Sequence, residues 1–87
     1  MKKVINVTEV DNEGLEAFLG KKITVYCFGF IYTGVLEGVN DKFIKLNGAK
    51  IVYDTGSHSS KDYAMVEPMP GDWYVMISAI ESFGDFK

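Results

Sequence analysis

Apolar and polar residues alternate with a period of two over most of the chain from residue 21 onward, as in half-buried β-strands. The first such segment, Lys21–Phe28, places Ile23, Val25 and Cys27 on one face and Thr24, Tyr26 and Phe28 on the other. The same pattern predicts further strands over Ile31–Val39, Phe43–Leu46, Lys50–Asp54, Tyr63–Glu67 and Trp73–Phe83. The chain beyond residue 20 is therefore expected to be almost entirely β-structure.

Glycine, proline and polar residues interrupt these predicted strands at defined places. Gly29 indicates a hairpin turn, and Asn47-Gly48 is a strong turn or bulge signal. Strand character resumes at Lys50, so Asn47-Gly48 is either the end of a strand or a kink within one. Pro68-Met69-Pro70-Gly71 breaks the pattern again, since two prolines cannot serve a central ladder. We expect a loop or hairpin insertion around residues 55–72, outside the main strands.

The first twenty residues have a different pattern. Residues 1–10 predict an arm, in which Val4-Ile5-Asn6-Val7 is either a short strand or ordered chain. Residues 11–20 predict a short helix that Asp11 or Asn12 caps and Gly20 ends. Its apolar face is formed by Leu15, Phe18 and Leu19, at i, i+3 and i+4.

These elements predict a mainly β fold in one domain spanning residues 1–87, because 87 residues leave no room for a second domain. A short N-terminal helix is followed by a small, bent, open barrel of five strands over residues 21–87. A sheet this small must curl to bury its inner face, and Gly34 and Gly38 permit sharp bending.

The composition adds an expectation of self-association. Apolar residues make up 47% of the chain and aromatic residues 14%, a high load for so small a domain. Some of this surface is expected to be buried against another copy. No apolar run approaches the length needed to span a bilayer, so no membrane association is predicted. Cys27, the single cysteine, is expected to be a small buried hydrophobe in a reducing cytoplasm.

The charge excludes some partners. The net charge is −3, and all nine basic residues are lysines. Proteins that hold duplex DNA by its phosphates usually carry a basic surface, and arginine is the side chain that grips phosphate or guanine with two bonds. Any nucleic-acid binding is therefore expected to rely on stacking, backbone groups and a few lysines.

The sequence shows no arrangement of residues typical of catalysis or metal binding. The chain has one histidine, His58, and one cysteine, too few for a zinc site, and no metal or cofactor is predicted. A Ser-His-Asp arrangement confined to the loop around His58 would lack fixed orientation and oxyanion donors. The glycines form no phosphate-binding pattern. We expect that the protein is not an enzyme.

Three stretches resemble sequence features of a known family. The segment from Gly29 to Asn40, GFIYTGVLEGVN, resembles the first signature of the Sm-like (Sm/LSm) family, with a turn glycine, an aromatic residue and a second glycine five positions later. Phe18–Val25 is similar to the family's helix-to-strand junction. Ile77-Ser78-Ala79-Ile80 resembles the end of the second motif in the bacterial RNA chaperone branch. Together these stretches cover 24 of the 87 residues.

The resemblance implies an architecture and an assembly. The fold would be an N-terminal helix stacked on a bent, five-stranded, open SH3-like (Sm-like) barrel. The assembly would be a homo-oligomeric ring closed by strand pairing between subunits, here around Trp73–Ile77 and Ala79–Phe83. In the family, the loop before the third strand and the loop between the last two strands hold single-stranded, often uridine-rich RNA at the ring's pore.

The resemblance places the candidate RNA site at the polar turn after the first motif, with the alignment open by one residue. Without a gap, Asn40 takes the family's acidic position, Lys42 the stacking position and Ile44 that of the base-reading asparagine. With one inserted residue, Asp41 becomes the acid and Phe43 the stacking group, which is the alignment we prefer. In both alignments the asparagine is absent, and Tyr74-Val75 stands in place of the bacterial Lys-His. The candidate nucleic-acid-binding residues are Asn40, Asp41, Lys42, Phe43 and Ser78.

Two functions are compatible with this pattern. The first is a ring that binds single-stranded RNA in RNA processing or as a chaperone, with the turn as a stacking site. The second is a structural ring that binds protein partners and has lost RNA binding, which the acidic charge and the missing arginines favour. In that case Asn40-Asp41 is a simple turn and Phe43 fills the barrel.

Overall fold

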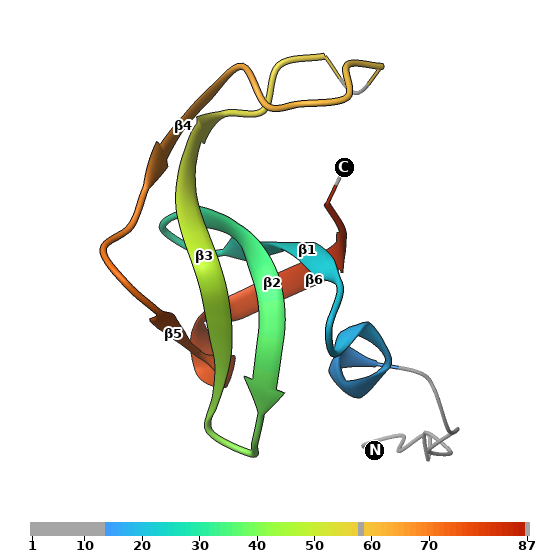
Figure 1. Cartoon of the computed structure of the whole chain (residues 1–87), viewed down its shortest axis with the longest axis vertical. Helices are drawn as coiled ribbons and strands as arrows, with labels where there is room; N and C mark the ends of the chain where they lie inside the picture. The colour runs from blue at the N-terminus through green and yellow to red at the C-terminus, as the bar shows by residue number, and fades with distance from the viewer. Residues whose placement is uncertain (1–13, 58, 87) are drawn as a thin grey trace, which may run out of the picture.

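The structure, a computed structural model, describes residues 14–57 and 59–86. Its described part is mainly β, with six antiparallel strands in one open sheet (Figure 1). The strand order is β4-β3-β2-β1-β6. The remaining strand, β5, lies off this path and pairs with β3. The strands are β1 (Lys22–Cys27), β2 (Ile31–Val39), β3 (Phe43–Asp54), β4 (Met65–Pro68), β5 (Trp73–Met76) and β6 (Ile80–Asp85). The prediction of a mainly β fold is confirmed.

The central strand β3 joins two segments that the sequence pattern separates. Asn47-Gly48 is a kink within this strand, because the ladder to β2 continues on both sides of it with a register shift between Thr33 and Val35. Gly48 takes a φ of 60°, a left-handed conformation that glycine adopts without strain. On one side of the kink β3 pairs with β5, and on the other with β4.

The structure does not show the helix that the sequence predicts over residues 11–20. Residues 14–20 contain a single 3-10 turn, η1 (Leu15–Phe18), while residues 11–13 and the predicted arm over residues 1–10 lie outside the described residues. Gly14 precedes the turn at a φ of 74° and Leu19 follows it in an extended conformation, so helical geometry ends at both residues. No helical turn in the described part is long and apolar enough to cross a membrane.

The predicted strand Trp73–Phe83 is two strands. A second 3-10 turn, η2 (Ile77–Ala79), separates β5 from β6. The division has a topological cause, since β5 pairs with β3 and β6 pairs with β1, two strands away in the sheet. The chain must turn between them, and the sheet therefore has six strands rather than the predicted five. β4 ends at Pro68, on an edge strand that tolerates proline.

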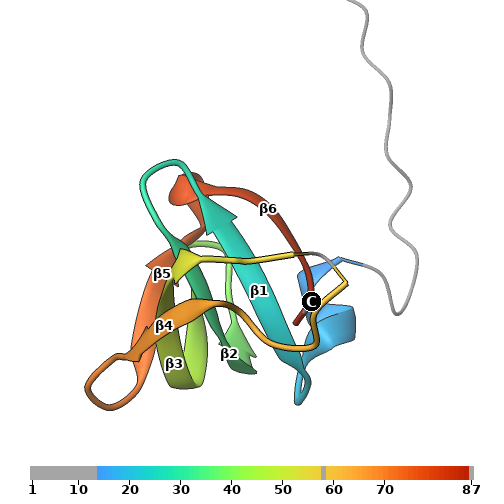
Figure 2. The same cartoon turned by 90° about the horizontal axis from the view of Figure 1, so that it is seen from above.

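The sheet is strongly curved (Figure 2), and its buried hydrophobic residues form one core. β1, β2, β3 and β5 each turn alternate side chains inward, and Phe18 of η1 packs against the same cluster. The buried residues of this cluster are Ile23, Val25, Leu36, Ile44, Leu46, Ala49 and Val75.

A second buried region lies on the opposite face of β1 and β2. Thr24 and Thr33, cross-strand partners, are each only 1% exposed. They are covered by Tyr63, from the loop between β3 and β4, and by Phe86 after β6. The Tyr63 hydroxyl, the Thr24 hydroxyl and the carbonyl oxygen of Phe86 lie within hydrogen-bonding distance of one another, and the two hydroxyls supply the donors. The segment predicted as an insertion thus packs back onto the sheet.

Candidate nucleic-acid interface

The predicted site begins at the turn between β2 and β3, which the side chain of Asn40 holds in shape. Asn40 Oδ1 accepts hydrogen bonds from the backbone N–H groups of Lys42 (2.8 Å) and Phe43 (2.9 Å). The backbone N–H of Asn40 donates to the carbonyl oxygen of Phe43 at 3.0 Å. Both lone pairs of this amide oxygen are therefore used within the turn. Asp41 and Lys42 are exposed at its tip.

A backbone hydrogen bond joins this turn to the connection between β5 and β6. The N–H of Ile77, the first residue of η2, donates to the carbonyl oxygen of Lys42 at 2.8 Å. Ser78 follows in the same 3-10 turn and is exposed. The structure therefore brings the predicted residues 40–43 and Ser78 into one region.

Phe43 lies outside the hydrophobic core. Its neighbour Ile44 points into the core and is fully buried, so Phe43 points to the outer face of β3 and is half-buried there. Its ring contacts Tyr74 of β5 edge to face, with centroids 5.2 Å apart and planes at 89°. Tyr74 is 53% exposed, so part of its ring remains open to a ligand.

Lys45 and Tyr74 lie in the candidate site, although the sequence analysis did not include them among the candidate residues. Lys45 is the direct cross-strand partner of Tyr74, and its Nζ lies 6.0 Å from the centroid of that ring. The period-two pattern contains the signal, because Lys45 falls two positions after Phe43 and shares its face. The pairing of β3 with β5, which brings Tyr74 into contact, is a long-range feature that the pattern does not encode.

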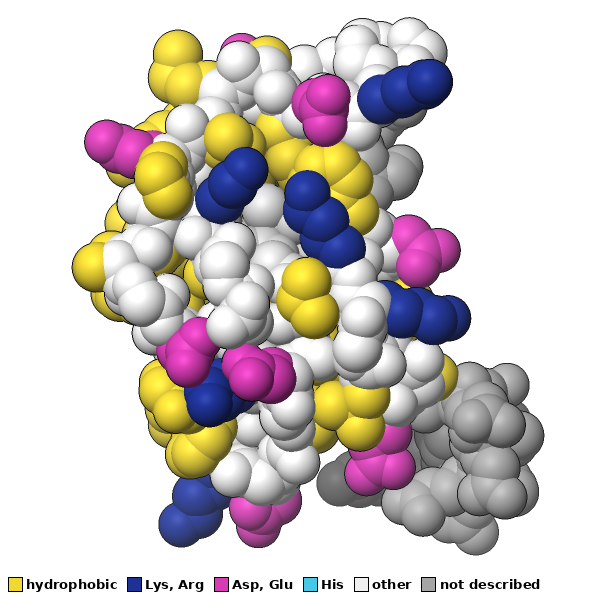
Figure 3. All heavy atoms as spheres, viewed as in Figure 1, with side chains coloured by type: hydrophobic (Ala, Val, Ile, Leu, Met, Phe, Trp, Pro, Cys, Tyr) yellow, Lys and Arg dark blue, Asp and Glu magenta, His cyan; other side chains and the backbone are white. Residues whose placement is uncertain are grey.

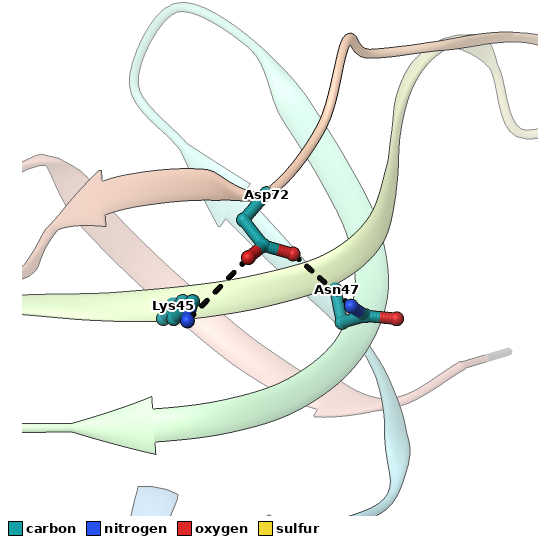
Figure 4. Close-up of polar contacts among 3 residues, drawn as sticks. All are labelled: Lys45, Asn47 and Asp72. Atoms are coloured by element: carbon teal, nitrogen blue, oxygen red, sulfur yellow. Dashed lines mark hydrogen bonds and ion pairs between the residues drawn. The ribbon is translucent and has the colours of Figure 1, made fainter.

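Polar contacts hold the Lys45 side chain on this face (Figure 4). Lys45 Nζ lies 3.4 Å from Asp72 Oδ2, and Asn47 Nδ2 donates to the other carboxylate oxygen at 3.0 Å. The negative charges of Glu37, Tyr74 when ionised, and Asp72 raise the pKa of Lys45, which therefore stays cationic at neutral pH. Lysine side chains are spread over the face shown in Figure 3, with acidic groups among them.

A pocket of about 200 Å³ lies beside this site, between the β1–β2 hairpin and β5. Its lining is mostly aromatic and apolar and includes Cys27, Phe30, Tyr32, Trp73, Tyr74 and Met76. Phe30 is 56% exposed and Phe28, at the hairpin tip, is 75% exposed. Figure 3 shows further hydrophobic side chains at the surface along the left border, over β4 and β5.

Within residues 14–57 and 59–86 no group of three or more His, Cys, Asp or Glu side chains is arranged to hold a metal ion. His58 lies outside the described residues. The exposed groups of the site are hydroxyl, carboxylate, amide, ammonium and aromatic, which suit stacking and hydrogen bonding.

No protein-family model matches the chain, and comparisons with curated proteins and with solved structures find no match.

Proposed function

We propose that the protein is a cytoplasmic, Sm-like ring subunit that binds single-stranded RNA through the turn at residues 40–43 and the adjoining face of β5. The observation that carries the proposal is the arrangement of Lys42, Phe43 and Tyr74. A turn fixed by three hydrogen bonds exposes Lys42, and the next residue in the chain, Phe43, supports the half-exposed ring of Tyr74.

Each group has a distinct part in this proposal. Tyr74 is the stacking surface, because Phe43 is half-buried and supports it edge to face. Lys42 and Lys45 contact backbone phosphates, while Asp41 accepts hydrogen bonds from a base edge. Asn40 holds the turn, since its amide oxygen is already saturated. Stacking on one aromatic ring contributes about 1–3 kcal/mol per base and tolerates every base, so weak sequence preference is expected.

The free edges of the sheet support the ring. In the described part, β6 pairs only with β1 and β5 only with β3, so each leaves one edge without a partner. Unpaired edges are a liability that pairing with another chain removes. Closing the curved sheet as a barrel within a ring would bring one copy of the 40–43 turn per subunit to a common rim. Repeated weak sites then give useful avidity.

The experiment measures binding of a fluorescein-labelled ten-nucleotide uridine RNA by anisotropy over a salt series. Lys42→Ala and Tyr74→Ala are compared with Lys61→Ala, an exposed lysine in the β3–β4 loop. We expect Tyr74→Ala to weaken binding roughly tenfold or more and Lys42→Ala to lessen the salt dependence, with Lys61→Ala unchanged. Light scattering checks that each variant forms the same oligomer.

Two results would contradict the proposal. A monomer of about 9.7 kDa at micromolar concentration contradicts the ring. Intact oligomers with the same RNA affinity in the two site variants and the wild type contradict the binding site.

The second candidate is an assembly ring that binds a protein partner. The observation that favours it is the aromatic pocket of about 200 Å³ with Phe28 and Phe30 exposed beside it, an apolar surface of the kind found in protein interfaces. Absence of RNA retention at the lowest salt, with an intact ring, favours this function over RNA binding.

A further inference from the structure

A separate pocket of about 170 Å³ lies on the outer face of the sheet, at the other end of β3 from the RNA site. It forms where the β3–β4 loop and the segment after β6 fold back over β1 and β2. Its lining includes Lys22, Thr33, Lys50, Asp62, Tyr63 and Phe86. Nothing in the proposed RNA site involves these residues.

Strand register brings the two lysines of this pocket to the same face. Thr33 of β2 lies directly opposite Lys50 of β3 and, on its other side, opposite Thr24 of β1. Lys22 precedes Thr24 by two positions and therefore shares its face. Both ammonium groups belong to regular strands of the central sheet, so the scaffold that carries them is rigid.

Unlike Lys45, neither lysine of the pocket forms an ion pair with a carboxylate of the described residues. The pair between Lys45 and Asp72 is the one ion pair among the described residues, so neither Lys22 nor Lys50 is paired with a described acid. Lys22 Nζ instead lies 3.9 Å from the centroid of the Phe86 ring, whose π-face holds the cation over the pocket. The described lining of the pocket contains two lysines and one aspartate, which is an excess of positive charge.

The remaining walls limit what the pocket accepts. Burial raises the pKa of the Tyr63 hydroxyl, which stays neutral and is bonded to Thr24 and to the Phe86 carbonyl oxygen. The volume is several times the roughly 30 Å³ that one water occupies, which leaves room for a tetrahedral oxyanion. A cation is disfavoured, because two lysines outweigh the single carboxylate of Asp62.

We propose that this pocket binds a phosphate group, with Lys22 and Lys50 as its two cationic contacts. A phosphate presents several strong acceptor oxygens and up to two negative charges, so two separate ammonium groups can each form a charge-assisted hydrogen bond to it. Asp62 opposes the anion and weakens binding. The phosphate comes either from a small phosphate ester or from an RNA backbone that reaches this end of β3.

The experiment is a ¹H–¹⁵N NMR titration of the full chain with sodium phosphate, at ionic strength held constant with sodium chloride. We expect saturable shifts at the amides of Thr33, Lys50 and Phe86. The double variant Lys22→Met/Lys50→Met keeps the apolar stems and should bind at least about tenfold more weakly, since two charge-assisted contacts are lost. Lys21→Met, which changes an exposed lysine outside the lining, should bind as the wild type does.

A variant that should raise the affinity for phosphate makes the test sharper. Asp62→Asn removes the opposing charge and should tighten phosphate binding severalfold. Shifts no larger than those in chloride alone, or shifts that the double lysine variant retains, overturn the proposal. Wild-type affinity in Asp62→Asn also counts against it.

Three further probes identify the source of the phosphate. Uridine 5′-monophosphate should shift the amides of Thr33, Lys50 and Phe86 and uridine should not, and shifts of these amides by uridine overturn the phosphate assignment. A ten-nucleotide uridine RNA that displaces phosphate identifies the RNA backbone as the source. RNA that binds without displacing phosphate identifies a small phosphate ester instead. Tyr74→Ala, which tests the RNA site, should leave phosphate binding unchanged, so the two proposals fail independently.

Discussion

Gly34 of β2 lies close to β3, and adding a side chain there tests how tightly the two strands pack. A Cβ atom at this position would lie 3.1 Å from the carbonyl oxygen of Asn47, 3.2 Å from the Cα of Ala49 and 3.2 Å from the Cβ of Leu46. Ordinary contacts of a Cβ are 3.4–4 Å. Two of the three neighbouring atoms belong to the backbone of β3, at its kink, and cannot rotate away.

The size of the effect follows from these contacts. Overpacking a well-packed site by one methyl group costs about 1–3 kcal/mol, and alanine regains about 0.4–1 kcal/mol by restricting the unfolded chain. Gly34→Ala is therefore expected to lower the free energy of unfolding by about 1–2 kcal/mol. Gly34→Val adds two further methyl groups and should cost about 3 kcal/mol or more. For a domain of this size, 1 kcal/mol shifts Tm by about 4–8 °C.

The assay is thermal and urea unfolding followed by circular dichroism at one fixed protein concentration, because oligomerisation makes Tm depend on concentration. Gly84→Ala in β6 is the matched control, since a Cβ there meets no atom within 4 Å. Its Tm should stay within a few degrees of the wild type. Equal Tm values for Gly34→Ala and Gly84→Ala would refute the close packing of β2 on β3.

Three further predictions concern other parts of the molecule. Asn40→Ala removes the acceptor for the N–H groups of Lys42 and Phe43 and should lower the free energy of unfolding by about 1 kcal/mol in a urea titration, whereas Asn40→Asp should keep most of it. Burial raises the pKa of the Cys27 thiol, so iodoacetamide should alkylate it more slowly in the native protein than in urea at pH 8; equal rates would contradict this. The pKa of Cys27 is higher in the folded state than in the unfolded state. The neutral thiol therefore makes its whole contribution to stability below the unfolded-state pKa, and this contribution is lost as the pH rises through the folded-state pKa. Tyr63→Phe removes one donor to the Phe86 carbonyl and should cost about 0.5–1.5 kcal/mol, and an unchanged urea midpoint would show that this cluster adds nothing to stability.

The strands that alternate regularly could be predicted from the sequence. The predicted Ile31–Val39 matches β2 at both ends, and the predicted Lys21–Phe28 exceeds β1 by one residue at each end. Period-two alternation indicates that one face of a strand is buried. It therefore identifies the strands and their inward-facing residues where only one face is covered. It fails at Thr24, predicted on the face opposite the core and yet 1% exposed, because a distant segment covers that face.

The sequence pattern does not predict where the chain leaves one neighbouring strand in the sheet and pairs with another. Nothing in the alternation of Trp73–Phe83 indicates that β5 and β6 pair with different strands, so the 3-10 turn between them was missed. For the candidate site, the sequence indicated the turn at residues 40–43 and, through the family resemblance, Ser78. It assigned Asn40 to ligand contact, whereas the hydrogen bonds give it a role within the turn. The contact between Phe43 and Tyr74 depends on the β3–β5 register.

The pairing of β6 with β1 has a consequence for how the chain folds. Partners such as Val25 and Phe83 are separated by most of the described sequence, whereas β1, β2 and β3 pair with their immediate neighbours along the chain. Closing so long a loop costs chain entropy before any contact repays it. We expect the meander β1–β2–β3 to form first and β6 to dock last, with overall folding in milliseconds to seconds, typical of sheets with many non-local pairings. Until β6 docks, the edge of β1 is open, so a newly collapsed chain is most prone to mispairing with another copy at this strand.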